Sequence, residues 1–146
     1  EVVTRPVYDE PFVVVLPQDH PLAGDKRVDP AALAEHRVLL MGEGHCFRDQ
    51  VLEACPGLNL AIQDDYASGH AIVEGSSLET LKHMVATGLG ITVLPRSAAE
   101  LASYGGKTLV VREFVEPVPT RTIAIAWRVS YPRHQAIDTL AGVLQD

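Results

Sequence analysis

The chain has 146 residues, a formal net charge of -7 and 47% hydrophobic residues. This length fits one compact domain or two small lobes. The acidic balance argues against this segment binding nucleic-acid phosphates by itself, and no apolar run approaches the roughly 20 residues that cross a membrane. The sequence shows no secretion signal, and two cysteines then fit a cytoplasmic thiol site better than a disulfide scaffold.

The first half of the chain alternates between strand and helix patterns, which predicts an α/β fold. Strands are expected at residues 2–8, 12–16 and 38–41, with a turn at residues 9–11. The uninterrupted apolar run at 12–16 is typical of a buried central strand. Asp29 and Pro30 supply an N-cap and a first-turn proline for a short helix that ends at Glu35.

The second half continues the alternation after a polar segment, residues 56–70, which we expect to be a mobile loop with a weak strand at 60–63. Ser76 and Glu79 form a capping-box pattern that opens a helix, and Gly88 is suited to end it. The last helix is expected to follow Pro132. Further elements are expected at residues 72–74, 91–94, 96–102, 108–112 and 121–127, and the core-facing residues of the last helix at Ile137, Leu140 and Leu144.

Residues 41–55 contain both cysteines of the chain. A glycine-rich turn ending at His45 leads into a predicted helix at 45–55, with Cys46 at its start and Cys55 at its end. Nine residues of helix would hold the two cysteines roughly 13 Å apart, whereas a disulfide needs Cα atoms within about 7 Å. The two thiols therefore cannot bond while the helix exists, but can bond once it unwinds.

Cys46 stands where a thiol becomes reactive. A helix N-terminus favours the thiolate; His45 and Arg48 add positive charge nearby, and Asp49 works against them. Peroxide converts a thiolate to a sulfenic acid, which a second thiol, here Cys55, can trap as a disulfide.

Two blander interpretations of the cysteines stay open. Free cysteines are among the most buried residues, so both thiols could be inert. A metal site built from His45, Cys46, Cys55 and His70 is disfavoured because it lacks the close cysteine pair of structural zinc sites. We expect neither a metal nor a cofactor.

The segment Gly44-His45-Cys46-Phe47-Arg48-Asp49-Gln50, with a second cysteine nine residues after the first, resembles the redox segment of the hydrogen-peroxide sensors among the LysR-type transcriptional regulators. The likeness continues at residues 17–23, 76–86, 88–95 and 119–123, and so covers most of the chain. The His-Cys segment is specific to the peroxide sensors, whereas the other matches are general to LysR-type effector domains.

The resemblance implies a fold and a domain organisation. LysR-type effector domains are similar to type II periplasmic binding proteins, in which two α/β lobes are joined by two crossover strands. Residues 12–107 would then form a complete second lobe that carries the redox segment 41–55. Residues 1–11 and 108–146 would form the crossovers and part of the first lobe. A DNA-binding domain and further residues of the first lobe are expected to precede this segment.

The resemblance also implies roles for individual residues. Cys46 matches the peroxidatic cysteine and Cys55 the resolving one. His45 and Asp49 match residues that line the peroxide site, and Arg121 matches a cationic residue that supports the thiolate. The family dimer surface maps to Leu78, Glu79, Lys82 and Ala86.

The function implied is that of a sensor rather than an enzyme. Hydrogen peroxide would drive formation of the disulfide, and the refolded segment would change the contacts of a homodimer, or of a tetramer in the full-length protein. DNA would be bound only through the separate N-terminal domain, and a glutaredoxin- or thioredoxin-type dithiol would restore the reduced state. Two alternatives remain: an effector domain that binds a small organic molecule, and a thiol peroxidase-like enzyme.

Overall fold

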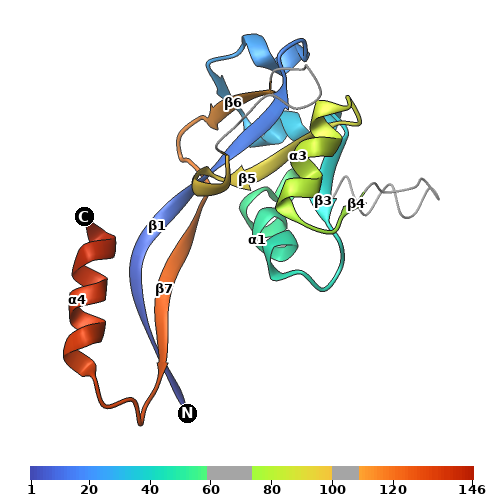
Figure 1. The fold of residues 1–146 in the computed structure, drawn as a ribbon. Coiled ribbons are helices and arrows are strands. Elements are labelled where there is room, and N and C mark those ends of the chain that lie inside the picture. The colour runs from blue at the N-terminus through green and yellow to red at the C-terminus, as the bar shows by residue number, and fades with distance from the viewer. Residues whose placement is uncertain (59–73, 100–108) are drawn as a thin grey trace. The chain divides into compact units, whose positions relative to one another are not determined.

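The computed structural model describes residues 1–58, 74–99 and 109–146, and it confirms the α/β class (Figure 1). Seven strands form one sheet in the order β2-β6-β1-β5-β3-β4, with β7 paired to β1. The weak strand expected at 60–63, most of the loop at 56–70, and parts of the elements expected at 72–74, 96–102 and 108–112 lie outside the described residues.

Most of the expected elements are present with bounds shifted by one or two residues. The short helix after Asp29 is confirmed, in 3-10 form, with the Asp29 side chain accepting from the Ala31 N–H. Helix α3 is capped by Ser77 rather than by Ser76. The strands are β1 (Val2–Pro17), β2 (Arg27–Val28), β3 (Val38–Met41), β4 (Glu74–Gly75), β5 (Ile91–Pro95), β6 (Leu109–Phe114) and β7 (Thr120–Arg128). The helices are η1 (Pro21–Gly24), η2 (Pro30–Glu35), α1 (Cys46–Ala54), α3 (Leu78–Ala86), η3 (Arg96–Ala98) and α4 (His134–Gln145).

The chain divides into two compact units, one made of residues 1–10 and 120–146 and a larger one made of residues 11–119. The sequence placed the return crossover from residue 108 onward, but residues 109–119 belong to the larger unit. The reason is strand pairing: β6 runs antiparallel to β1 from Val13 to Pro17.

The turn expected at residues 9–11 is wrong, because β1 continues through it without a break. The polar residues that suggested a turn have partners on β7 instead. Thr122 donates to the Asp9 carboxylate at 2.8 Å, and Arg121 Nε donates to Glu10 Oε1 at 3.0 Å. Proline tolerates extended backbone and lacks only the N–H, so Pro11 does not end the strand.

The core of the larger unit lies on both faces of the sheet. Residues 12–16 of β1 are at most 1% exposed, which confirms the expected buried central strand. Their side chains alternate between two apolar clusters, as the two-residue period of a strand requires. Val51 of α1 belongs to one cluster and Leu81 of α3 to the other, so the two helices cover opposite faces.

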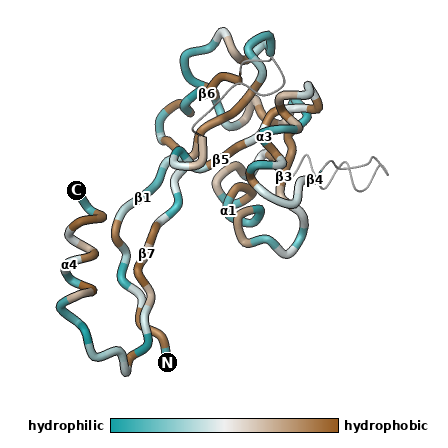
Figure 2. The backbone as a smooth tube through the Cα atoms, in the orientation of Figure 1, coloured by the Kyte–Doolittle hydropathy of each residue, from teal (hydrophilic) through white to brown (hydrophobic). Residues whose placement is uncertain are grey.

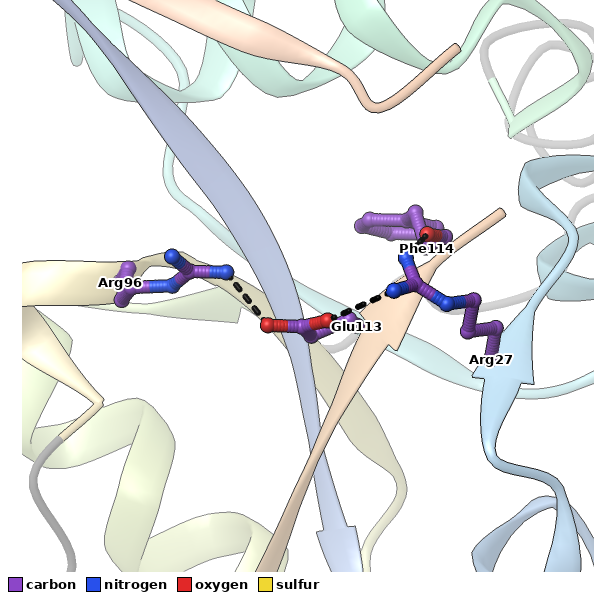
Figure 3. Close-up of polar contacts among 4 residues, drawn as sticks. All are labelled: Arg27, Arg96, Glu113 and Phe114. Carbon is purple, nitrogen blue, oxygen red and sulfur yellow. Dashed lines mark hydrogen bonds and ion pairs between the residues drawn. The ribbon is translucent and has the colours of Figure 1, made fainter. Parts of the chain in front are cut away.

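A surface ion-pair network joins three elements of the larger unit (Figure 3). Glu113 on β6 lies between Arg96, at 2.6 Å, and Arg27, at 3.5 Å. Arg27 also donates to the Phe114 carbonyl at 3.3 Å. All three charged side chains are about half exposed, so solvent weakens each pair.

The smaller unit contains β7, the first part of β1 and α4, and Figure 2 shows apolar positions recurring along α4. Of the three residues expected to face a core, Ile137 is half-buried, whereas Leu140 and Leu144 are 45% and 40% exposed in this chain. The face of α4 that meets the strands is instead marked by Ala141, which is fully buried, and by Gln145, which donates to the Val7 carbonyl. Within the described residues, no helix has the length and apolarity to cross a membrane.

Candidate functional site

The turn that precedes α1 is built by two glycines. Buried strand β3 ends at Met41, and the Gly42 N–H then bonds to the Gly75 carbonyl at 3.2 Å, which ties the turn to β4. Gly44 has a φ of 88°, a left-handed conformation that favours glycine. His45 occupies the N-cap without a side-chain cap bond, and Cys46 is the first residue of the helix.

The two cysteines lie at opposite ends of α1, and both are free thiols. Cys46 is exposed, whereas Cys55 is 1% exposed and donates its backbone N–H to the Val51 carbonyl at 2.9 Å. Nine residues of helical rise separate them by roughly 13 Å, which is beyond disulfide reach. The expected helix between two free thiols is therefore confirmed.

Cys55 is held in an apolar environment. Its side chain belongs to the same cluster as Val51 and Leu58, and the Leu58 N–H donates to the Cys55 carbonyl at 3.0 Å. This burial raises the pKa of the Cys55 thiol to about 11. In its present position the thiol is thus protonated at neutral pH and a poor nucleophile, and it reacts well only after this part of the chain opens.

Arg48 fastens the first turns of α1 to the sheet. The residue is 5% exposed, and its Nη1 donates to the Met41 carbonyl at 2.9 Å and to Glu74 Oε1 at 3.0 Å. From the sequence, Arg48 was expected only to add positive charge near Cys46, and its bonds to the sheet were not predicted. The role depends on the topology, because β3 and β4 are parallel neighbours and so place Glu74 at the edge of the sheet where α1 begins.

Phe47 makes a second attachment. Its ring contacts the ring of Phe12 on β1, with centroids 6.0 Å apart and planes at 51°. The half-buried Phe47 side chain also packs against both apolar clusters of the larger unit. Helix α1 is thus held by an ion pair, by an aromatic contact and by the buried thiol at its end.

The residues expected to support Cys46 divide between the two units. His45 and Asp49 are exposed and lie at the N-cap and in the first turn of α1, next to Cys46 in sequence. Arg121 lies on β7 in the smaller unit, where its Nη2 is 2.9 Å from Glu10 Oε1. Their roles toward peroxide stay predictions. Among the residues that the structure describes, no three His, Cys, Asp or Glu side chains are grouped as metal ligands would be.

The four residues expected at a dimer surface differ in exposure. Glu79 is exposed and Leu78 is half-buried, whereas Lys82 and Ala86 are only 5% and 6% exposed within the chain itself. Lys82 Nζ lies 2.8 Å from Glu79 Oε1. A dimer role for this helix stays a prediction, and Leu78 and Glu79 are the two of the four that a partner would reach most easily.

The fold, together with the two free cysteines at the ends of α1, indicates the class of protein. Residues 1–146 match the LysR substrate binding domain family, and the chain belongs to that family. It is 40% identical over 139 residues to a probable hydrogen peroxide-inducible genes activator of Mycobacterium leprae, covering 95% of this chain and 42% of the relative. The reduced form of the OxyR regulatory domain from Pseudomonas aeruginosa is 50% identical, with a TM-score of 0.80, and the match covers 99% of this chain and 66% of that one.

Two further structures, a reduced and an oxidised form of OxyR, are each 31% identical to this chain. The TM-score is 0.73 for the reduced form and 0.68 for the oxidised form, with coverage of 98% and 99% of this chain and 63% and 64% of theirs. The chain is thus similar to both redox forms, and its own two cysteines are free thiols. The chain spans under half the length of the curated relatives it matches.

Proposed function

We propose that this chain is the redox-sensing regulatory domain of a LysR-type transcriptional regulator that responds to hydrogen peroxide. The observation that carries the proposal is the placement of an exposed Cys46 and a buried Cys55 at opposite ends of one helix. The similarity to proteins named for induction by hydrogen peroxide, and to both redox forms of OxyR, supports it.

The chemistry begins at Cys46. Its thiolate sulfur attacks one peroxide oxygen, the O–O bond breaks, and hydroxide leaves, so the sulfur is oxidised to a sulfenic acid. The sulfur of Cys55 then attacks the sulfenic sulfur; the S–O bond breaks, water leaves, and the disulfide forms. One peroxide is reduced to two waters for each pair of thiols. The exposed His45 and Asp49 flank the position where peroxide would react.

The second step requires α1 to open, because the intact helix keeps the sulfurs out of reach. Opening breaks the Arg48 hydrogen bonds and the Phe47 ring contact, and it exposes Cys55. Disulfide formation must outweigh these losses, which amount to a few kcal/mol. The redox signal is the difference in structure of residues 41–55 between the reduced form, with α1 intact, and the form with the disulfide.

The remaining parts of the proposal concern the whole regulator. It would be a cytoplasmic homodimer, or a tetramer at full length, that binds DNA through its N-terminal domain. The α3 surface would change partners on oxidation, with Arg121 supporting the thiolate. A cellular dithiol of the glutaredoxin or thioredoxin type would reduce the disulfide. Because recovery depends on that reductant, we expect one peroxide consumed per reduction cycle rather than sustained enzymatic turnover.

The test is peroxide treatment of the reduced chain and of two variants, followed by mass spectrometry of the thiols. Wild type should form the Cys46–Cys55 disulfide, Cys55→Ser should stop at a Cys46 sulfenic acid, and Cys46→Ser should remain unoxidised. Free thiols in treated wild type, or an unchanged regulatory response in Cys46→Ser, would point to an organic effector instead. Fast continuous peroxide consumption with a dithiol would point to a peroxidase.

A further inference from the structure

Phe47 connects the redox helix to the central strand of the larger unit. It follows Cys46 directly, so it lies in the turn of α1 that holds the reacting sulfur. Its ring contacts the ring of Phe12, which is 1% exposed. Arg48, by contrast, is bonded to β3 and to Glu74 on β4. The aromatic pair is thus a direct side-chain contact from this turn to β1.

Phe12 also marks a junction in the chain. The larger unit begins at Pro11 and ends at Pro119, so the chain passes between the units next to these two prolines. The Phe12 N–H donates to the Pro119 carbonyl at 2.9 Å and joins the two passages. Phe12 therefore contacts the redox helix through its ring, and through its amide it bonds to Pro119, where the chain passes between the units a second time.

We infer that Phe47 is a positioning residue that transmits the state of α1 to the paired passages at Phe12 and Pro119. The inference rests on the proposed function, because it needs α1 to unwind on oxidation. Unwinding at Cys46 displaces Phe47, and Phe12 then loses its aromatic partner. The middle of β1 is then less constrained, and the hydrogen bond between Phe12 and Pro119 opens more often. Such a two-state contact is the physical element that coupling between distant sites requires.

The size of the effect follows from the contact. Aromatic pairs contribute about 0.5–1.5 kcal/mol beyond their buried area, which corresponds to a roughly 2- to 12-fold change in an opening equilibrium. Amide hydrogen exchange measures that equilibrium locally. Exchange of the Phe12 amide in the whole chain should therefore rise about 2- to 12-fold when the disulfide forms.

Four variants test whether the relay, meaning transmission from α1 through Phe47 to Phe12, is distinct from a general loosening of the fold. Phe47→Leu removes the ring, and Phe12→Leu removes the other half of the same contact, so either tests the pair if one fails to fold. Phe47→Tyr keeps an aromatic ring and should behave as wild type. Phe114→Leu is the matched control, because Phe114 is fully buried in the same apolar cluster as Phe12 but lies on β6.

In Phe47→Leu, exchange at Phe12 should already be fast in the reduced chain, and oxidation should change it less than about twofold. Phe114→Leu should keep the full oxidation-dependent rise. An equal rise in Phe47→Leu and wild type overturns the relay, as does wild-type exchange at Phe12 that ignores a disulfide shown by mass spectrometry. In both cases the proposed function stands. Failure of peroxide to form the disulfide in wild type overturns the proposed function and the relay together.

Discussion

The Arg48 guanidinium lies 3.0 Å from Glu74 Oε1 and 2.9 Å from the Met41 carbonyl oxygen, so one buried side chain ties α1 to two neighbouring parallel strands. The Arg48 side chain is 6% exposed and that of Glu74 33%, so the pair is shielded from solvent on one side. A charge held in this way is costly to leave without its partner. The same pair that stabilises the closed helix must break before the cysteines can meet.

Glu74→Gln should therefore loosen the helix without altering its shape. The amide keeps an acceptor oxygen but loses the charge, and the free energy of unfolding should fall by about 1–2 kcal/mol. Because α1 opens more often, peroxide should form the disulfide roughly 5–30 times faster at the resolving step. Urea unfolding and stopped-flow thiol kinetics measure the two effects.

The matched control is Asp138→Asn, which removes the charge from the exposed pair with Arg5. The Asp138 side chain is 70% exposed, so the loss should stay below about 1 kcal/mol, and disulfide formation should keep its wild-type rate. A resolving step in Glu74→Gln as slow as in wild type would show that another contact limits the opening of α1.

The cap of α3 gives a second prediction. Ser77 Oγ accepts the Thr80 N–H at 3.1 Å. Ser77→Ala should lower the free energy of unfolding by about 1 kcal/mol, as loss of a helix N-cap usually does. Ser76→Ala, the adjacent and equally exposed change, should stay within about 0.5 kcal/mol. Thermal unfolding of both variants checks this, and a larger effect at Ser76 would restore the capping box read from the sequence.

Local signals in the sequence were enough to predict much of the fold and the main features of the site. The apolar run at 12–16 identified the buried strand, and the glycine-rich turn before Cys46 identified the start of α1. Each of these signals lies within a few neighbouring residues, so it can be recognised without knowing the rest of the fold.

What the sequence did not predict depends on partners elsewhere in the chain. Asp9 and Glu10 are turn residues by composition but strand residues here, because β7 supplies their partners. Arg48 is buried because Glu74, 26 positions away, accepts from it. Leu140 is exposed because the strands meet a different face of α4. Such contacts can be predicted only once the order and direction of the strands and helices are known.

Gly90 gives a prediction about close backbone packing. A Cβ at this position would lie 2.5 Å from the Arg37 carbonyl oxygen, and backbone yields little. Gly90→Ala should lower the free energy of unfolding by about 1–3 kcal/mol through displacement of β3 from β5. Gly142→Ala on α4 meets open space and should instead add about 0.5–1 kcal/mol from helix propensity. Chemical denaturation compares the two, and a neutral Gly90→Ala would show that this strand end moves freely.

Burial of Cys55 makes the stability of the chain depend on pH in a defined direction. The thiol ionises at its usual pKa of 9.0 when exposed, but at about 11 in the fold. Between these values the unfolded chain has lost the proton that the folded chain retains, so stability falls as pH rises. This thiol does not lower the free energy of unfolding well below pH 9. By pH 11 the free energy of unfolding should be lower by about 2–3 kcal/mol.

Two cysteine variants isolate this contribution from that of other groups that titrate at high pH. Cys55→Ala should unfold more easily at pH 7 because it leaves a cavity, but its free energy of unfolding should fall less steeply between pH 8 and 11. Cys46→Ala, the matched variant, removes the exposed thiol and leaves the buried Cys55 in place. Urea titrations across this range test the difference. Equal slopes in wild type and Cys55→Ala would mean that the resolving thiol is already in contact with water, and that α1 need not open for it to ionise.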